Sequence, residues 1–271
     1  MFGKLIASPS APARRLSSSG TVAALGLSVA LCYAGILRGG IMTERGGYGQ
    51  FCPVSMAAEV VCTRWTALIL REFLCGSTRF NDLRRGVPKM SPTLLSKRLK
   101  ELEEAGVIAS VDLGSGGSEY RLTPMGRDLE PLIIGLGEWG HRWIESRLSL
   151  KNLDPSLLMW DMRRNLKPAP LPGRRCTIQF LYPELVEGDR QWWLVVEEGE
   201  VDLCKIDPGF EVDLLITGSL RSMTSVWMGI TSLGEERTAG RLMIDGDKAI
   251  ARTIDRWLGL STFAVMSRRV A

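Results

Sequence analysis

The sequence predicts a multi-domain fold in which a mainly α unit with a two-stranded ribbon precedes an α+β unit built on one antiparallel sheet with helices on one face. Two observations support this division. Apolar residues recur at helical spacing between residues 63 and 105, whereas strand-like runs at hairpin spacing fill the chain after residue 175. The 271 residues, of which 45% are hydrophobic and 24% charged, are ordinary for a globular protein of two domains.

The first segment, residues 1–41, differs in composition from the rest. Basic residues precede an apolar run over 21–37, as in a signal peptide or a marginal membrane helix. Three interpretations stay open: a real anchor, a disordered tail, or an upstream segment before a natural start at Met42. We favour a start at Met42, because no clean small-x-small cleavage site follows the apolar run. The expected domains are then 42–149 and 150–271.

Two helices are expected at the start of the first domain. The first begins at an N-cap, Thr63, and Gly76 ends it. The second is shorter; it begins at Ser77 or Thr78 and is closed by Gly86.

A third helix carries the strongest signals. Ser91 is its N-cap, Pro92 takes the first helical position and Gly106 terminates it. The apolar side of this helix consists of Leu95, Leu99 and Leu102. The opposite, polar side consists of Thr93, Lys97, Lys100 and Glu104. A hydroxyl-bearing and basic N-terminal half is what a recognition helix needs in the major groove of DNA. Taken alone, this helix could equally be an ordinary amphipathic helix with a solvated face.

A ribbon follows the third helix directly. The pattern predicts a strand over Val107–Val111, a flexible turn over Asp112–Ser118 and a returning strand over Glu119–Leu122. Such a ribbon is the wing of a winged helix-turn-helix, and its tip can reach phosphates or the minor groove. Between Arg64 and Lys100 the basic residues greatly outnumber the two acidic ones. Double-stranded operator DNA is therefore the expected partner. The candidate DNA-binding residues are Arg79, Lys89, Ser91, Pro92, Thr93, Ser96, Lys97, Arg98, Lys100, Ser115, Gly116, Ser118 and Arg121.

Over about Cys52–Trp143 the chain resembles the HxlR-type winged-helix regulators. The motifs that carry the resemblance are Cys52-Pro-Val, Arg64-Trp-Thr followed by LILRE, Arg79-Phe-Asn-Asp-Leu, Ser91-Pro-x-Leu-Leu-Ser-x-Arg-Leu-x-x-Leu, Glu104-Ala-Gly and Tyr120-x-Leu-Thr-Pro-x-Gly. The resemblance implies operator binding by a homodimer and makes Cys52 a candidate redox-sensing thiol. One departure is that Cys62-Thr63 stands where the family usually has a glycine pair. Without a demonstrable charge nearby, an inert Cys52 thiol is the plainer interpretation.

A long helix is expected after the ribbon. Thr123 caps it, Pro124 lies in its first turn, and it runs towards Arg147. Its broad apolar stripe comprises Leu129, Leu132, Ile133, Leu136, Trp139, Trp143 and Ile144. A winged-helix core is too small to bury this stripe, so we expect the 124–147 helix to form the homodimer interface. His141, within this helix, is interpreted as structural or solvent-facing rather than catalytic.

The second domain is predicted from strands separated by turns. The expected strands are Cys176–Tyr182, Gln191–Glu197, Val201–Ile206, Glu211–Gly218 and Arg241–Ile244, and the expected helices are Ser219–Gly229 and Asp247–Trp257. The segments 212–218 and 240–249 resemble the C-terminal half of sterol-carrier-protein-type lipid-binding domains, which implies a site for a small apolar effector. The ligand-pocket candidates are Trp192, Leu214, Ile216, Met223, Trp227, Met243 and Trp257. For each of them, plain core packing is the alternative.

Composition argues against most enzyme classes. Six cysteines lack metal-ligand spacing, and the single histidine leaves little for nucleophilic catalysis, so we expect no enzyme, no metal and no cofactor. The predicted function is a cytoplasmic, dimeric DNA-binding regulator with an effector-sensing second domain and no stable membrane partner. Two alternatives stay open. One is a thiol-based regulator whose second domain is only structural, and the other is a lipid carrier whose winged helix serves protein contacts.

Overall fold

The computed structural model describes residues 47–114, 117–145 and 150–270. The predictions for residues 1–41, for the wing tip at Ser115 and Gly116, and for the helix end at Arg147 lie outside the described residues. Residues Tyr48–Ala271 form one compact unit. Within it lie two separate hydrophobic cores, one in each predicted half of the chain.

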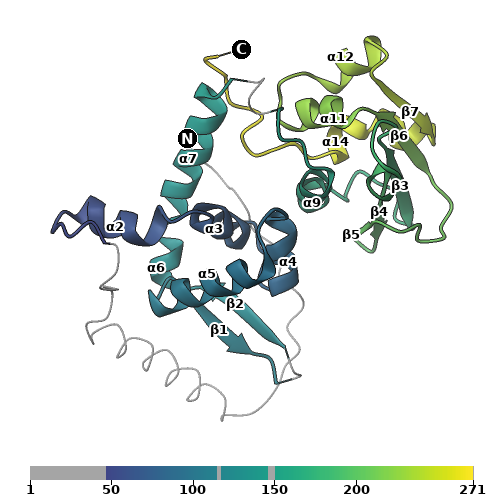
Figure 1. The fold of residues 1–271 in the computed structure, drawn as a ribbon. Helices are drawn as coiled ribbons and strands as arrows, with labels where there is room; N and C mark the ends of the chain where they lie inside the picture. Colours follow the sequence, from purple (N-terminus) through teal and green to yellow (C-terminus); the bar gives the residue numbers. More distant parts are fainter. Residues whose placement is uncertain (1–46, 115–116, 146–149, 271) are drawn as a thin grey trace. The chain divides into compact units, whose positions relative to one another are not determined.

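The first core is built from helices and one two-stranded sheet (Figure 1). These elements are α2 (Pro53–Val61), α3 (Thr66–Leu74), α4 (Phe80–Gly86), α5 (Pro92–Glu104), β1 (Ile108–Asp112), β2 (Ser118–Leu122), α6 (Pro124–Arg127) and α7 (Glu130–Trp143). The strands pair antiparallel, with Ser110 opposite Tyr120. The predicted winged helix-turn-helix is thus present.

Helix α5 forms as its sequence predicts. Ser91 Oγ accepts a hydrogen bond from the Leu94 N–H at 3.3 Å, and Pro92 lies at the first helical position, where its missing N–H costs nothing. Gly106 follows the helix with φ +73°, a conformation that favours glycine. The apolar side of α5, made of Leu95, Leu99 and Leu102, is buried in the first core.

Helix α3 begins later than the sequence predicted, and helix α2 was not predicted at all. Thr63 does not cap α3; its hydroxyl donates instead to the Glu59 carbonyl of α2 at 3.2 Å. The helix begins after Trp65, which has φ +80°, and the Arg64 guanidinium lies 5.4 Å from the Trp65 ring centroid. The chain therefore turns sharply between α2 and α3, which side-chain periodicity does not reveal.

The start of α4 also corrects the prediction. Its N-cap is Arg79, without a side-chain cap bond, rather than Ser77 or Thr78. The Ser77 hydroxyl instead donates to Glu72 at 3.3 Å, inside the protein.

The long helix expected after the wing is two helices. Thr123 caps the first of them, as predicted, by accepting from the Gly126 N–H at 3.2 Å. The helix is interrupted before Glu130 because Pro131 has no N–H to donate to the Arg127 carbonyl. The second part, α7, ends at Trp143.

The second core surrounds a five-stranded sheet. Its elements are α9 (Pro155–Asn165), β3 (Cys176–Leu181), α10 (Glu187–Arg190), β4 (Gln191–Glu197), β5 (Glu200–Cys204), β6 (Leu214–Gly218), α11 (Leu220–Trp227), α12 (Leu233–Thr238), β7 (Leu242–Gly246), α13 (Lys248–Arg252) and α14 (Ile254–Trp257). Figure 1 shows α9, α11 and α14 together on one side of the sheet.

The sheet is mixed rather than antiparallel, which corrects the predicted fold class. Its strand order is β5-β4-β3-β6-β7, and β3 pairs parallel with β6, placing Ile178 opposite Leu214. Hairpin spacing predicted only neighbouring antiparallel pairs, whereas β5 lies at one edge and the chain crosses over to β6 on the far side of β3. Helices α9 and α12 were not predicted, and the helix expected over Asp247–Trp257 is divided at Thr253.

Candidate nucleic-acid interface

Helix α5 presents a polar stripe to solvent. Thr93 and the side chains of Lys97 and Lys100 are exposed, the two lysines by 69% and 77%. Each lysine faces an acidic residue one turn later on the same helix, at 3.9 Å for Lys97 and 3.7 Å for Lys100. Exposed pairs of this kind contribute little stability, so both ammonium groups can exchange these partners for phosphates or base edges.

Arg98 does not belong to this stripe. Its side chain is only 20% exposed and is held in an ion pair with Glu101 one turn later. An α-helix has 3.6 residues per turn, so consecutive residues point about 100° apart, and Arg98 lies towards the leucine side rather than beside Lys97. Of the basic residues predicted on α5, the structure therefore groups the two lysines and separates the arginine. Ser96 is exposed at the flank of the stripe.

The wing is attached to the helices at two places. The Tyr120 N–H of β2 donates to the Thr78 carbonyl before α4 at 2.8 Å. The Ser110 N–H of β1 donates to the Glu103 carboxylate of α5 at 3.0 Å. These bonds fix the ribbon beside α5, an arrangement typical of a winged helix.

Two predicted arginines share one carboxylate at the base of the wing. Arg121 lies 3.0 Å and Arg79 3.6 Å from Glu119, and both side chains are mostly exposed. The hydrogen bond from Arg121 lowers the pKa of Glu119, and the charge of Arg79 acts in the same direction. One carboxylate between two guanidinium groups leaves a net positive charge here, next to the exposed Ser118. Lys89 is exposed in the loop before α5.

Helix α7 exposes a continuous apolar stripe. Leu132, Leu136, Trp139 and Trp143 are each about half exposed, at 49%, 51%, 59% and 49%. Their spacing of four, three and four residues places them on one side of the helix. The opposite side is occupied: His141 is buried and bonds the Met266 carbonyl at 3.2 Å, and the Phe263 ring covers Gly137 so closely that a Cβ would lie 2.2 Å from it.

Cys52 is exposed at the N-cap of α2. The nearby backbone N–H groups of Ser55 and Val54 lower the pKa of its thiol, although Cys52 makes no side-chain capping hydrogen bond. This local cause was not visible in the sequence, which showed only the absence of a nearby charge. Cys62, the second thiol noted nearby in sequence, is also exposed.

The ligand-pocket candidates fall into two groups. All but one belong to the second hydrophobic core, namely Trp192, Leu214, Ile216, Met223, Trp227 and Trp257. Met243 is instead 55% exposed on β7 and does not join them.

The residues that the structure describes contain no cluster of three or more His, Cys, Asp or Glu side chains able to hold a metal ion. Over the same described ranges, no single helix has the length and apolar composition needed to span a membrane. The pair α2 and α3 meets those two criteria only when taken together, across a bend of 79°.

A capped helix with an exposed lysine stripe and a wing fixed beside it defines a winged-helix protein of the DNA-binding class. The HxlR-like helix-turn-helix family model matches residues 60–148. The chain covers 92% of YvaP, an HTH-type transcriptional regulator of Bacillus subtilis, with 35% identity over 99 residues, or 35% of this chain. This chain therefore belongs to the HxlR-like helix-turn-helix family and is a transcriptional regulator of that type.

Other similarities lie in the same part of the chain. The HTH-type transcriptional regulator Rv3095 of Mycobacterium tuberculosis is 36% identical over 137 residues, which cover 44% of this chain and 86% of that protein. The solved structure of the reduced redox regulator HypR is 32% identical and covers 33% of this chain and 90% of that one, with a TM-score of 0.31.

One group of site residues could not be found from the sequence. Glu72 is one of only two acidic residues in the basic stretch and yet is fully buried, where it contacts residues of the second core. Its position between Ile69 and Phe73 on an apolar helix side was the available signal. Its partners on α9 could not be foreseen, because α9 itself was not predicted.

Proposed function

We propose that this chain binds operator DNA as a homodimer, with α5 in the major groove and the β1–β2 wing against the flanking phosphates. The observation that carries the proposal is the exposed stripe of Thr93, Lys97 and Lys100 beside a wing that is fixed by backbone hydrogen bonds. Arg79 and Arg121 extend the positive surface to the base of the wing. The operator lies in the cytoplasm, where we expect the protein to act.

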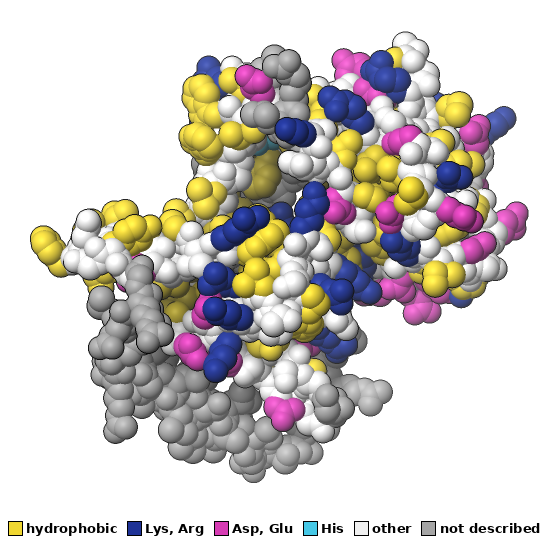
Figure 2. Space-filling model, in the orientation of Figure 1, with side chains coloured by type: hydrophobic (Ala, Val, Ile, Leu, Met, Phe, Trp, Pro, Cys, Tyr) yellow, Lys and Arg dark blue, Asp and Glu magenta, His cyan; other side chains and the backbone are white. Residues whose placement is uncertain are grey.

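The second copy would pack on the apolar stripe of α7. Four half-exposed large side chains in line are unusual on the surface of a monomer. Exposed Phe51, Val54 and Met56, at and before α2, add further apolar surface. Figure 2 shows hydrophobic side chains gathered over both helices. A twofold dimer would present two recognition helices to half-sites about one helical turn of DNA apart, roughly 34–36 Å.

Fluorescence anisotropy with DNA from the promoter regions beside the chain's own coding sequence tests operator binding. We expect tight binding to one palindromic fragment and a steep loss of affinity with added salt, because lysines and arginines that neutralise phosphates release counterions. Binding without salt dependence, or none to any such fragment, would contradict the proposal and favour a winged helix that serves protein contacts.

We also propose that the second domain senses a small hydrophobic effector. The sterol-carrier-like segments and the abundance of Trp and Met in this half support it. An effector that bound one dimer geometry better would change the spacing of the recognition helices and hence the affinity for paired half-sites. Calorimetric titration with apolar metabolites, followed by operator binding with and without any ligand found, tests this; a ligand that leaves operator affinity unchanged would contradict it.

Thiol-based regulation through Cys52 is the second candidate. The exposed position of this thiol and the two backbone N–H groups that lower its pKa favour it. Operator affinity should then fall after oxidant treatment in the wild type and not in Cys52→Ser. Equal responses in both would leave Cys52 without a regulatory role.

A further inference from the structure

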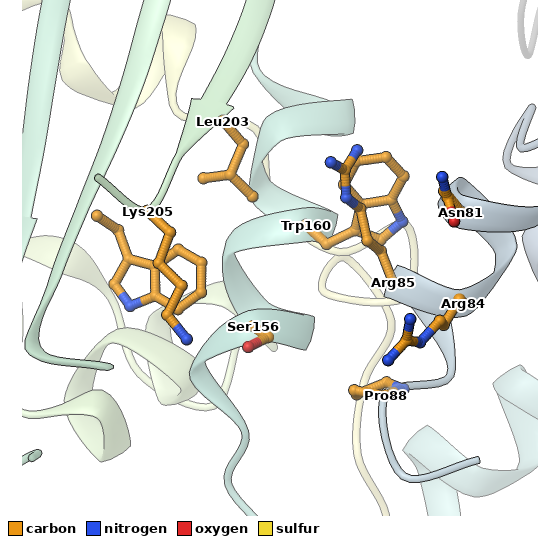
Figure 3. A pocket seen from close by; sticks show the side chains of 9 residues that line it. Asn81, Arg84, Arg85, Pro88, Ser156, Trp160, Leu203 and Lys205 are labelled. Atoms are coloured by element: carbon orange, nitrogen blue, oxygen red, sulfur yellow. The ribbon is translucent and has the colours of Figure 1, made fainter. Parts of the chain in front are cut away.

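A pocket of about 470 Å³ lies where α4 of the winged helix faces the second core (Figure 3). One wall comes from the winged helix and the other from α9, β4 and β5. The lining residues that matter for its chemistry are Arg84, Arg85, Ser156, Trp160, Trp192 and Lys205. The volume is in the range of small-molecule sites.

The polar lining is positive. Three cationic side chains border the pocket, whereas no Asp or Glu is among its lining residues. Arg85 pairs with Asp82 at 3.2 Å and Lys205 with Asp189 at 2.7 Å. Arg84 makes no ion pair within the described residues, and Figure 3 shows its guanidinium directed towards Ser156. A guanidinium without an ion-pair partner is a natural partner for a carboxylate.

The apolar lining comprises Pro88, Leu203 and two indole rings, whose N–H groups are already bonded. Trp160 Nε1 donates to the Glu72 carboxylate at 3.3 Å, and Trp192 Nε1 donates to the Asp189 carbonyl at 2.8 Å. Arg85 lies 5.2 Å from the Trp160 ring centroid, and Lys205 lies 5.2 Å from that of Trp192. Both rings are nearly buried, at 3% and 4% exposure, so each faces the pocket together with the cation that lies over it.

From this combination we infer that the pocket binds a small aromatic carboxylate, with its carboxylate at Arg84 and its ring against the Arg85–Trp160 and Lys205–Trp192 pairs. This deepens the proposed effector function and rests on it for the regulatory consequence. It places the ligand between the winged helix and the second domain, at a site that includes only Trp192 among the pocket residues expected from sequence. A ligand held by α4 and β5 at once would join the two halves more firmly, and any effect on DNA affinity would be reciprocal.

Isothermal titration calorimetry of the full chain with indole-3-acetate tests the inference, with neutral indole-3-acetamide as the matched probe. We expect the acetate to bind at least about tenfold more tightly than the amide, because only the acetate can pair with Arg84. Arg84→Gln should remove that preference, and Arg84→Gln/Lys205→Gln should weaken acetate binding further. Arg237→Gln, an exposed arginine on α12, is the control and should leave both affinities unchanged.

Equal affinities for acetate and amide, no heat at millimolar acetate, or unchanged acetate binding in the double variant would each overturn the site. Circular dichroism of each variant checks that it is folded; both substituted side chains are exposed. Fluorescence anisotropy with operator DNA, measured on the same samples, distinguishes a failure of the pocket inference from a failure of the proposed DNA-binding function. Intact DNA binding with no acetate binding removes only the pocket, whereas acetate binding that leaves DNA affinity unchanged removes the effector role and keeps the site.

Discussion

Arg164 donates from Nη1 to Glu72 Oε2 across 2.6 Å, and this buried ion pair joins α9 of the second core to α3 of the winged helix. The carboxylate of Glu72 is fully buried and also accepts from Ser77 and Trp160. Burial alone would lower the pKa of Arg164, but the charges of Glu72 and Asp161 outweigh it and raise that pKa. The two halves are thus connected through a charge pair that neither half could bury alone.

Replacing Glu72 with Gln should therefore destabilise the chain strongly. The change removes a buried carboxylate that pairs with both Arg164 and Arg71 and leaves Arg164 with Asp161, so we expect a loss of unfolding free energy towards the about 3–5 kcal/mol typical of a broken buried pair. Gly86→Ala should act in the same direction, because a Cβ there would lie 1.8 Å from the Glu72 carboxyl carbon. Denaturant unfolding measures both, with the exposed Glu104→Gln as the control. A loss for Glu72→Gln no larger than the control's would show that the pair contributes nothing.

Substitutions on α5 should separate the two lysines from the arginine. Lys97→Ala and Lys100→Ala should each weaken operator binding, by about 1–3 kcal/mol if the lysine reads a base. If the lysine instead neutralises a phosphate, its removal should reduce the salt slope by about 1. Arg98→Ala should have a much smaller effect, because Arg98 is already engaged with Glu101 away from the stripe.

Anisotropy titrations at several salt concentrations measure these effects. Lys248→Ala, an exposed lysine on α13, is the control and should leave operator affinity and salt slope unchanged. Wild-type affinity in both lysine variants would exclude α5 as the reader of DNA.

The sequence predicted those features of the site that depend on residues close together in the chain. The cap at Ser91, the leucine spacing of α5 and the pairing of the two wing strands each depend on residues close together in the sequence, and the structure has all three. The parallel pairing of β3 with β6 and the pairing of Glu72 with Arg164 depend on segments that meet only in the folded chain. Periodicity cannot indicate such contacts, and the pocket between α4 and the second core is made almost entirely of them.

The apolar stripe of α7 should control dimerisation. Trp139→Glu places a charge in the middle of the proposed interface, where desolvation without a partner is unfavourable, so the dimer should dissociate into monomers at micromolar concentration. Sedimentation velocity measures the change. Met243→Glu, at an equally exposed apolar residue on β7, is the control and should remain dimeric. A Trp139→Glu protein that stays dimeric would place the interface elsewhere.

The reactivity of Cys52 should depend on pH differently in folded and in unfolded protein. The backbone N–H groups of Ser55 and Val54 at the start of α2 lower its pKa, so the fraction of thiolate at a given pH is larger in the folded chain than in the unfolded one. Because the thiolate is the nucleophile, alkylation of Cys52 by iodoacetamide should reach half of its maximal rate at a lower pH in native protein than in urea. Cys176 supplies the opposite case: it is buried, and burial together with Asp213 raises its pKa to about 12, so it should react only after unfolding. Peptide-level mass spectrometry resolves the two thiols. If Cys52 shows the same pH midpoint in native and in unfolded protein, the start of α2 does not activate it, and thiol sensing at this position loses its physical basis.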